Sequence, residues 1–212
     1  MNLNIYILFF IVTLTSYSQE IYHFDIEFVY ETRSLKNDRL IHTDRFYCST
    51  INDKIYLIEG KIKNKAVSYY LYDFEKKLFF SFKTENLFDS KLGKISNSIY
   101  GALNKNCENS TQDIVIERIN SSTFRTTAFI NKAKNKIIQK IDYSIKESKK
   151  NYTRPIYWTT NLFNCKSEEI YGVVTLANIY NKKGKKISTQ KLVAENTIKL
   201  KIDTNFLITN DE

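Results

Sequence analysis

Two histidines are present in the chain, and each begins a His-x-Asp triplet, His23 with Asp25 and His42 with Asp44. Residues i and i+2 of a β-strand lie on the same face, so each imidazole can lie beside a carboxylate. Two such pairs suggest a metal site. If the two segments form a hairpin, His42 lies opposite Tyr30, more than about 20 Å from His23 and on the other face. We therefore expect exposed strand histidines and no shared metal site.

No motif for nucleophilic catalysis is recognisable in the sequence, and neither histidine neighbours a reactive Cys or Ser. The sequence contains no Gly-x-Ser-x-Gly segment, and its five glycines are too dispersed to form a phosphate-binding loop. A hydrolase would need His23 or His42 in a cleft beside a nucleophile. We expect a protein that is not an enzyme and that uses no cofactor.

The three cysteines, Cys48, Cys107 and Cys165, are separated by 59 and 58 residues, which fits no zinc motif. Cys107 and Cys165 lie in polar, loop-like sequence, whereas Cys48 lies in an alternating segment as a small hydrophobic residue. We predict a disulfide between Cys107 and Cys165 in an oxidising compartment, with three free thiols as the alternative.

Lysines gather in the segments that we expect to be turns. Alternate turns of an antiparallel meander lie at the same end, so these lysines, with Lys36, would form a basic rim around one mouth. The alternative is that lysine is common in solvated turns and protects sheet edges from pairing. The rim residues are Lys61, Lys63, Lys65, Lys132, Lys134, Lys136, Lys182, Lys183, Lys185 and Lys186.

Aromatic and aliphatic residues on alternating positions predict one apolar sheet face. Such a face can line a cavity for an acyl chain, or it can be an ordinary filled core, and the sequence does not separate the two. The candidate ligand-binding residues are Phe24, Ile26, Phe28, Tyr69, Leu71, Leu78, Phe80 and Phe82.

The elements that would position these residues are mostly strands. Residues 22–30 alternate between apolar and polar side chains, as a half-buried strand does. Turn signals at short intervals favour a mainly β fold, an antiparallel meander of about ten strands that forms a curved half-barrel or open barrel, with a sandwich as the alternative. Further strands are expected over 39–50, 54–60, 66–72, 78–83, 113–119, 123–130, 136–147, 169–180 and 185–196, with 197–207 also extended.

One segment breaks the strand pattern. Between residues 91 and 104 the apolar residues Leu92, Ile95, Ile99 and Leu103 recur at spacings of 3, 4 and 4, which suits one face of a helix. Two glycines in this segment weaken a helix by about 1 kcal/mol each. We predict a single helix over 91–104.

The N-terminus has the pattern of a signal peptide. Residues 5–14 form an uncharged, mostly apolar run of ten, whereas a bilayer-spanning helix needs about 20. Ser16 and Ser18 supply the small residues before a cut after Ser18. We therefore expect residues 1–18 to be a leader and 19–212 to be a single β-rich domain, exported to the periplasm, the cell envelope or the medium. The leader resembles those of secreted proteins from Bacteroidetes-type bacteria.

The chain of 212 residues carries 32 Lys and Arg against 23 Asp and Glu, a net charge of +9, and none of these residues lies in 1–18. A basic exported domain is attracted to anionic partners such as lipid headgroups. No segment combines dense Lys and Arg with a recognisable nucleic-acid-binding motif, so we expect no nucleic-acid partner.

The C-terminal third resembles a known family. The run Tyr171–Tyr180, a turn containing Gly184 and Lys185, and a last stretch with Asn196, Asp203 and Phe206 are similar to the closing segment of the LolA/LppX-like family. That family comprises periplasmic lipoprotein carriers and lipid-binding half-barrels, and it opens with a helix, whereas this chain opens on a strand after its leader. The resemblance implies a half-barrel fold and a lipid-related ligand.

Two functions therefore follow from the sequence. The first is a periplasmic or secreted binding protein that carries the acyl chains of lipids or lipoproteins on an apolar concave face with a basic rim. The second is a structural or adhesive cell-envelope protein with a filled core, which associates with the anionic envelope surface only through its charge.

Overall fold

The computed structural model of the chain describes residues 21–60, 68–84, 87–88, 96–102, 113–130, 136–154 and 170–203. The predicted leader, 1–18, and the predicted disulfide partners Cys107 and Cys165 lie outside these residues. Within the described part of the chain, no helix has the length and apolar character needed to span a membrane.

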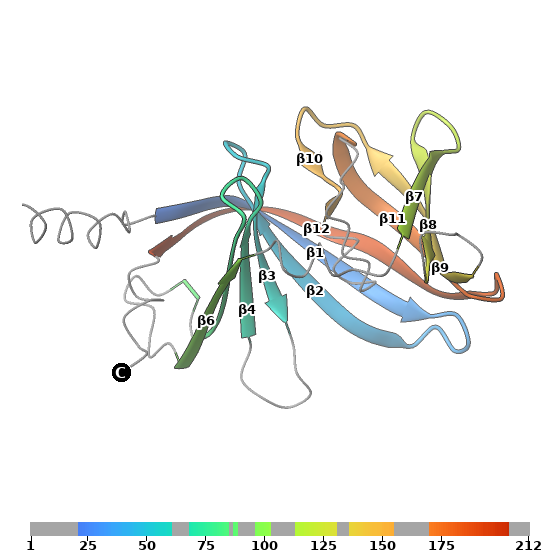
Figure 1. Cartoon of the computed structure of the whole chain (residues 1–212), viewed down its shortest axis with the longest axis horizontal. Helices are drawn as coiled ribbons and strands as arrows, with labels where there is room; N and C mark the ends of the chain where they lie inside the picture. Colours follow the sequence, from blue (N-terminus) through green and yellow to red (C-terminus); the bar gives the residue numbers. More distant parts are fainter. Residues whose placement is uncertain are drawn as a thin grey trace, which may run out of the picture.

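All the described strands belong to one sheet, in the order β6-β5-β4-β3-β2-β1-β12-β11-β9-β8-β7 (Figure 1). Neighbours along this path pair antiparallel, and β10 pairs parallel with β11 beside it. The strands are β1 (Ile21–Ser34), β2 (Leu40–Cys48), β3 (Ile55–Gly60), β4 (Ser68–Asp73), β5 (Leu78–Lys83), β6 (Ser96–Ala102), β7 (Asp113–Arg118), β8 (Thr123–Phe129), β9 (Ile137–Lys146), β10 (Asn151–Tyr152), β11 (Gly172–Asn181) and β12 (Lys186–Asp203).

The predicted mainly β meander is confirmed, and the sheet is open because β6 and β7 end the strand order without pairing with each other. Alternating apolar and β-branched residues favour pleated, half-buried strands, and apart from β6 and β10 the strands form where the sequence predicts them. At the centre β1 and β12 pair along their whole lengths, from Ile21 opposite Asp203 to Ser34 opposite Ser188. β12 is thus one 18-residue strand across two segments that the sequence analysis treated separately.

The prediction of a helix over 91–104 is wrong for the residues that the structure describes. Ser96–Ala102 form β6, which pairs antiparallel with β5 from Lys83 opposite Ser96 to Leu78 opposite Ala102. The pairing satisfies backbone groups along an edge of β5 that the helix would leave open. Gly101 lies inside the predicted helix and lowers its stability, so tertiary hydrogen bonding outweighs a short helical periodicity.

The sheet has two hydrophobic clusters, and its first strands contribute to both. We call the first the inner cluster, because it joins β1–β4 to β8, β9 and β11; it contains Phe28, Tyr30, Phe46, Cys48, Tyr56, Ile58, Tyr72, Ala128, Ile141, Tyr143, Tyr152, Ile170, Val173, Val174, Ala177 and Ile179. The second, the outer cluster, contains Tyr22, Phe24, Tyr47, Leu57, Tyr69, Leu71, Phe80, Phe82, Leu87, Leu200 and Ile202.

Burial on both faces is clearest where β2 and β3 pair. Phe46 and Cys48 lie in the inner cluster, and Tyr47 between them lies in the outer cluster. All three side chains are at most 2% exposed. A strand covered on both faces contains consecutive apolar residues rather than a clean alternation, and this explains why the second predicted strand alternates less regularly than the first.

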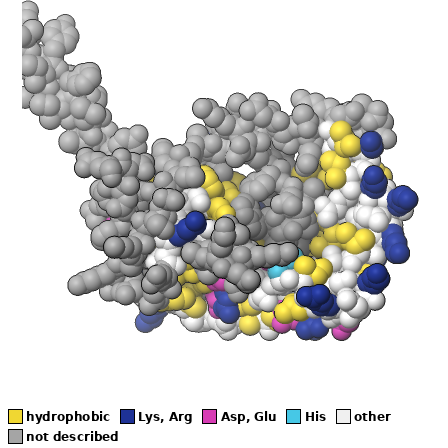
Figure 2. All heavy atoms as spheres, turned by 90° about the horizontal axis from the view of Figure 1, so that it is seen from below, with side chains coloured by type: hydrophobic (Ala, Val, Ile, Leu, Met, Phe, Trp, Pro, Cys, Tyr) yellow, Lys and Arg dark blue, Asp and Glu magenta, His cyan; other side chains and the backbone are white. Residues whose placement is uncertain are grey.

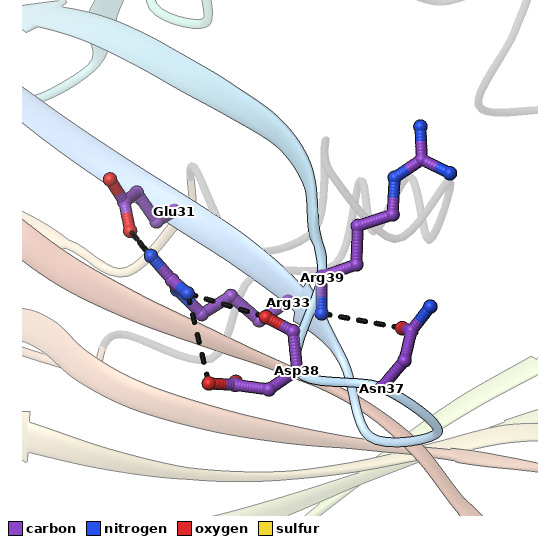
Figure 3. Close-up of polar contacts among 5 residues, drawn as sticks. All are labelled: Glu31, Arg33, Asn37, Asp38 and Arg39. Carbon is purple, nitrogen blue, oxygen red and sulfur yellow. Dashed lines mark hydrogen bonds and ion pairs between the residues drawn. The ribbon is translucent and has the colours of Figure 1, made fainter.

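The hairpin that joins β1 to β2 differs in register from the prediction. His42 lies opposite Thr32, and Asp44 lies opposite Tyr30, so the pairing is displaced by two residues. Asp38 in the turn has a φ of 49°, which is the left-handed conformation that Asp tolerates better than most residues. Figure 3 shows this turn, where the Arg39 backbone N–H donates to Asn37 Oδ1 at 3.3 Å.

Candidate functional site

The predicted apolar face is divided between the two clusters. Phe24 lies in the outer cluster, whereas Phe28 lies in the inner cluster with Ile26 packed against it. The pairing of β1 with β12 shifts in register between Phe24 and Ile26, and side chains on the two sides of this shift pack in different clusters. The prediction of one continuous face is therefore wrong for Ile26 and Phe28.

The other predicted face residues do lie together. Tyr69, Leu71, Phe80 and Phe82 are in the outer cluster with Phe24, and Leu78 packs against it. Leu71 and Phe82 are 0% exposed, so they touch no space large enough for water. This part of the face is filled core, and any opening for a ligand must lie at its margin.

A cavity of about 520 Å³ lies at that margin, beside Phe24. We call it the Phe24 cavity. Its walls come from the start of β1, the end of β12, the loop after β2, and Leu87 with Phe88. The apolar lining residues are Phe24, Ile51, Leu87, Phe88, Ile198 and Leu200.

The polar lining of the Phe24 cavity consists of His23, Asp25, Ser49, Lys199 and Lys201. Lys199 and Lys201 alternate along β12 with buried side chains, and His23 on β1 pairs with Lys201. Asp25 supplies a carboxylate, which accepts hydrogen bonds from the Thr50 backbone N–H at 2.7 Å and from the Thr50 hydroxyl. These bonds fix the loop after β2 against β1. The lining therefore presents an apolar wall with positive charge beside it.

A partly buried ionic network lies next to this cavity. Arg45 Nη1 lies 2.6 Å from Glu27 Oε1, and its Nε lies 3.8 Å from Glu59 Oε2. The Tyr47 hydroxyl donates to Glu59 at 3.3 Å, and the Tyr47 ring contacts Phe88 edge-on. Burial, followed by the negative charge of Glu59, raises the pKa of Tyr47. Tyr47 thus connects this network to Phe88, which lines the cavity.

The second His-x-Asp pair lies elsewhere, on β2. His42 Nε2 lies 3.0 Å from Asp44 Oδ2, and Gln190 from β12 donates to the same oxygen at 3.3 Å. Cys48 is buried, burial raises the pKa of its thiol, and it lies six residues along β2 from His42, roughly 20 Å away. Its thiol is therefore neither ionised nor within reach of the imidazole.

Metal binding finds no support in the described ranges, where no group of three or more His, Cys, Asp or Glu side chains could hold an ion. The register places His23 and His42 far apart along β1 and β2.

A second cavity, of about 750 Å³, lies near Arg118, Phe124 and Tyr171. Arg118 there is engaged by the backbone oxygens of neighbouring loop residues.

Part of the predicted basic rim gathers at one end of the sheet. The backbone N–H of Leu35 donates to Ile187 O at 3.2 Å, so the β1–β2 turn with Lys36 lies beside the β11–β12 turn. The latter turn carries Lys182, Lys183, Lys185 and Lys186. Figure 2 shows Lys and Arg side chains along this end.

The start of β9 lies at the same end, because Asn181 pairs with Gln139 and the exposed Lys136 directly precedes β9. The remaining predicted rim residues, Lys61, Lys63, Lys65, Lys132 and Lys134, lie outside the described residues.

Sequence reasoning missed the Phe24 cavity as a distinct site. Lys199, Leu200 and Lys201 lie in the last expected strand, but nothing in their pattern indicates that they meet Leu87 and Phe88. No model of a known protein family matches this chain, and no curated protein matches it.

Proposed function

We propose that the protein is a non-enzymatic binding protein that holds an acyl chain of a lipid or lipoprotein in the Phe24 cavity. The observation that carries this proposal is the cavity itself, whose volume of about 520 Å³ falls within the range of about 300–1,000 Å³ typical of ligand sites. An acyl chain gains free energy when it leaves water for such an apolar wall.

The charges around the cavity favour a ligand with an anionic head group. Lys199 and Lys201 are exposed, and His23 is paired beside Lys201. An anionic head group at this position would remain partly hydrated while it interacts with the ammonium groups. The proposed ligand class is therefore an amphipathic anion with one apolar chain.

The proposed setting is the cell envelope or the medium outside the cytoplasm. Its support is the apolar run of residues 5–14, followed by small residues, at the N-terminus. The resemblance of the closing segment to lipid-binding half-barrels agrees with this setting, and membership of that family stays a prediction.

Native mass spectrometry and lipid extraction on the protein purified from its host test the proposal. We expect a stoichiometric co-purified acyl species, and uptake of a fluorescent fatty acid by the delipidated protein. An apo mass together with no uptake of the fatty acid or of a phospholipid would contradict it.

A matched pair of variants locates the site. Phe88→Ser removes a cavity wall whose side chain is half exposed, and we expect about tenfold weaker uptake, because a partly buried aromatic contact contributes about 1–1.5 kcal/mol. Ile119→Ser removes a similarly exposed apolar side chain that does not line the cavity, and it should leave uptake unchanged. Equal affinities for both variants would place the ligand elsewhere.

A second function is favoured by a different observation, the filled inner cluster. Phe28, Phe46 and Cys48 are 0% exposed, so the space between the two parts of the sheet is packed rather than hollow. A structural or adhesive envelope protein needs only such a packed core and a charged surface. Absence of any bound acyl species would make this function the better account.

A further inference from the structure

The end of the sheet formed by residues 33–41 and 181–188, here called the hairpin end, combines exposed apolar side chains with a concentration of positive charge. Its apolar side chains are exposed at the turns, each by between 42 and 55%, with values of 48% for Leu35, 42% for Leu40, 55% for Ile41 and 44% for Ile187. Because Leu35 N–H donates to Ile187 O, the two turns lie side by side, and their exposed apolar side chains belong to one end of the sheet.

The hairpin end also concentrates the charge of the protein. Its two segments contain seven cationic side chains and one acidic side chain, a net charge of +6 out of +9 for the whole chain. The acidic residue, Asp38, is engaged by Arg33, whose Nη1 lies 3.8 Å from Asp38 Oδ2 and whose Nη2 lies 3.0 Å from Glu31 Oε2 (Figure 3). Arg39 extends away from this group (Figure 3).

We propose that the hairpin end docks on the surface of an anionic lipid bilayer. Aliphatic side chains at the tip of a turn can enter the boundary between headgroups and acyl chains, while flanking lysines stay at the level of the headgroup phosphates. Lys182 and Lys183 on one turn and Lys36 on the other flank the apolar side chains in this way. This inference is independent of the proposed acyl-chain site.

The same features argue against other occupants. Lysine is depleted in the cores of protein–protein interfaces, and two copies of a surface with charge +6 repel each other. The two segments contain no aromatic side chain on which a nucleic-acid base could stack. Exposed aliphatic residues flanked by lysines are the chemistry that suits a bilayer surface.

Docking would orient the molecule. The paired strands β1 and β12 run from the hairpin end at Ser34 and Ser188 to Ile21 and Asp203, a length of roughly 40 Å. The Phe24 cavity lies at that far end, so a docked molecule would hold the cavity away from the bilayer.

Vesicle co-sedimentation of the protein tests the proposal. We expect binding to vesicles of phosphatidylcholine mixed with phosphatidylglycerol, much weaker binding to phosphatidylcholine alone, and loss of binding at high salt. A Leu35→Trp variant should show a blue-shifted emission with the mixed vesicles, since its indole would leave water. Absence of binding to the mixed vesicles would overturn the proposal.

Charge reversal on matched turns gives the control. Lys182→Glu with Lys183→Glu should weaken binding to the mixed vesicles by more than about tenfold. Lys76→Glu with Lys77→Glu makes the same change in net charge on the β4–β5 turn and should preserve most of the binding. An equal loss of vesicle binding in both variants would show that the net charge alone attracts the protein to the bilayer. It would overturn the assignment of docking to the hairpin end.

Self-association is measured in parallel. If sedimentation velocity shows a dimer that an Ile187→Ser variant dissociates, the hairpin end is a contact between copies and the bilayer proposal is wrong. Thermal unfolding of each variant checks that binding was lost without loss of the fold. Because fatty-acid uptake depends on Phe88 at the other end, failure of docking and failure of the proposed function are distinguishable.

Discussion

The His42 imidazole and the Asp44 carboxylate lie 3.0 Å apart on one face of β2. The hydrogen bond to Asp44 raises the pKa of His42 above its ordinary value of 6.5, against the opposing effect of partial burial. Because folding favours the protonated imidazole, the pair stabilises the fold fully below pH 6.5. This contribution is lost as the pH rises through the raised pKa.

We predict that Asp44→Asn lowers the pKa of His42 toward 6.5, because it removes the charge that favours the imidazolium. Titration of the imidazole protons by NMR measures this change, and a His42→Gln variant assigns the signal. The difference in unfolding free energy between the wild type and His42→Gln should shrink as the pH is raised above the pKa. A His42 pKa unchanged by Asp44→Asn would show that the pair does not control it.

The sequence placed His42 beside Asp44 correctly, but the predicted register of the β1–β2 hairpin was wrong by two residues. The two outcomes have different causes. Residues i and i+2 share a strand face whatever the register, so His42 and Asp44 could be placed together from spacing alone. The opposite residue depends on the turn, and Asp38 in a left-handed conformation moves the centre of the hairpin past Lys36. For His23 the same triplet gives a different result, because Asp25 is engaged by Thr50.

At the scale of elements, alternation located the strands because burial of one face imposes a period of two. The exceptions are elements whose formation depends on a distant partner. β6 forms against β5, and the two-residue β10 forms against Gly172 and Val173 of β11. Neither partner is visible in the local pattern, so a helix was predicted for β6 and no strand was predicted for β10.

Two glycines with positive φ, one at the start of β11 and one in the β11–β12 turn, test where the backbone requires glycine. Gly172 has a φ of 152°, and an added Cβ would lie 2.8 Å from the Lys146 carbonyl oxygen. Gly184 in the β11–β12 turn has a φ of 75°, and its added Cβ would meet nothing within 4 Å. Both positions disfavour a side chain by conformation, and only Gly172 also disfavours it by contact.

We predict that Gly172→Ala lowers the free energy of unfolding by about 2–4 kcal/mol, from strain together with overpacking. Gly184→Ala should lower it by about 1 kcal/mol, from conformation alone. Urea denaturation of both variants measures the difference. Equal losses would show that β9 moves away at Lys146, so that the close approach of its carbonyl oxygen adds no cost to a side chain at position 172.

At the scale of the whole molecule, the division of apolar residues into two clusters could not be predicted. Phe24, Ile26 and Phe28 keep the parity of one face, and only the register shift against β12 separates Phe24 from the other two. A shift of this kind depends on pairing between residues about 170 positions apart in the chain. The Phe24 cavity lies at the shift, so Phe24 lines it, whereas other residues of the predicted face, such as Leu71 and Phe82, lie in filled core.

Hydrogen bonds from buried tyrosines connect the two parts of the sheet that the inner cluster joins. The first part contains β1–β4, and the second contains β8, β9 and β11. The Tyr30 hydroxyl donates to Val174 O at 2.9 Å, and the Tyr56 hydroxyl donates to Asn151 O. Both side chains are at most 2% exposed, so the carbonyls that they contact are shielded from water. Loss of either hydroxyl leaves a buried acceptor without this partner, which costs about 1–3 kcal/mol.

We predict that Tyr30→Phe and Tyr56→Phe each lower the free energy of unfolding by about 1–2 kcal/mol and raise amide hydrogen exchange mainly in β8, β9 and β11. Tyr22→Phe is the matched control, because its hydroxyl donates at 3.0 Å to Asp73 of β4, within the first part of the sheet. It should destabilise the protein without this regional increase in exchange. A uniform rise in exchange for all three variants would mean that the open sheet unfolds as one unit, with no separation of its two parts before global unfolding.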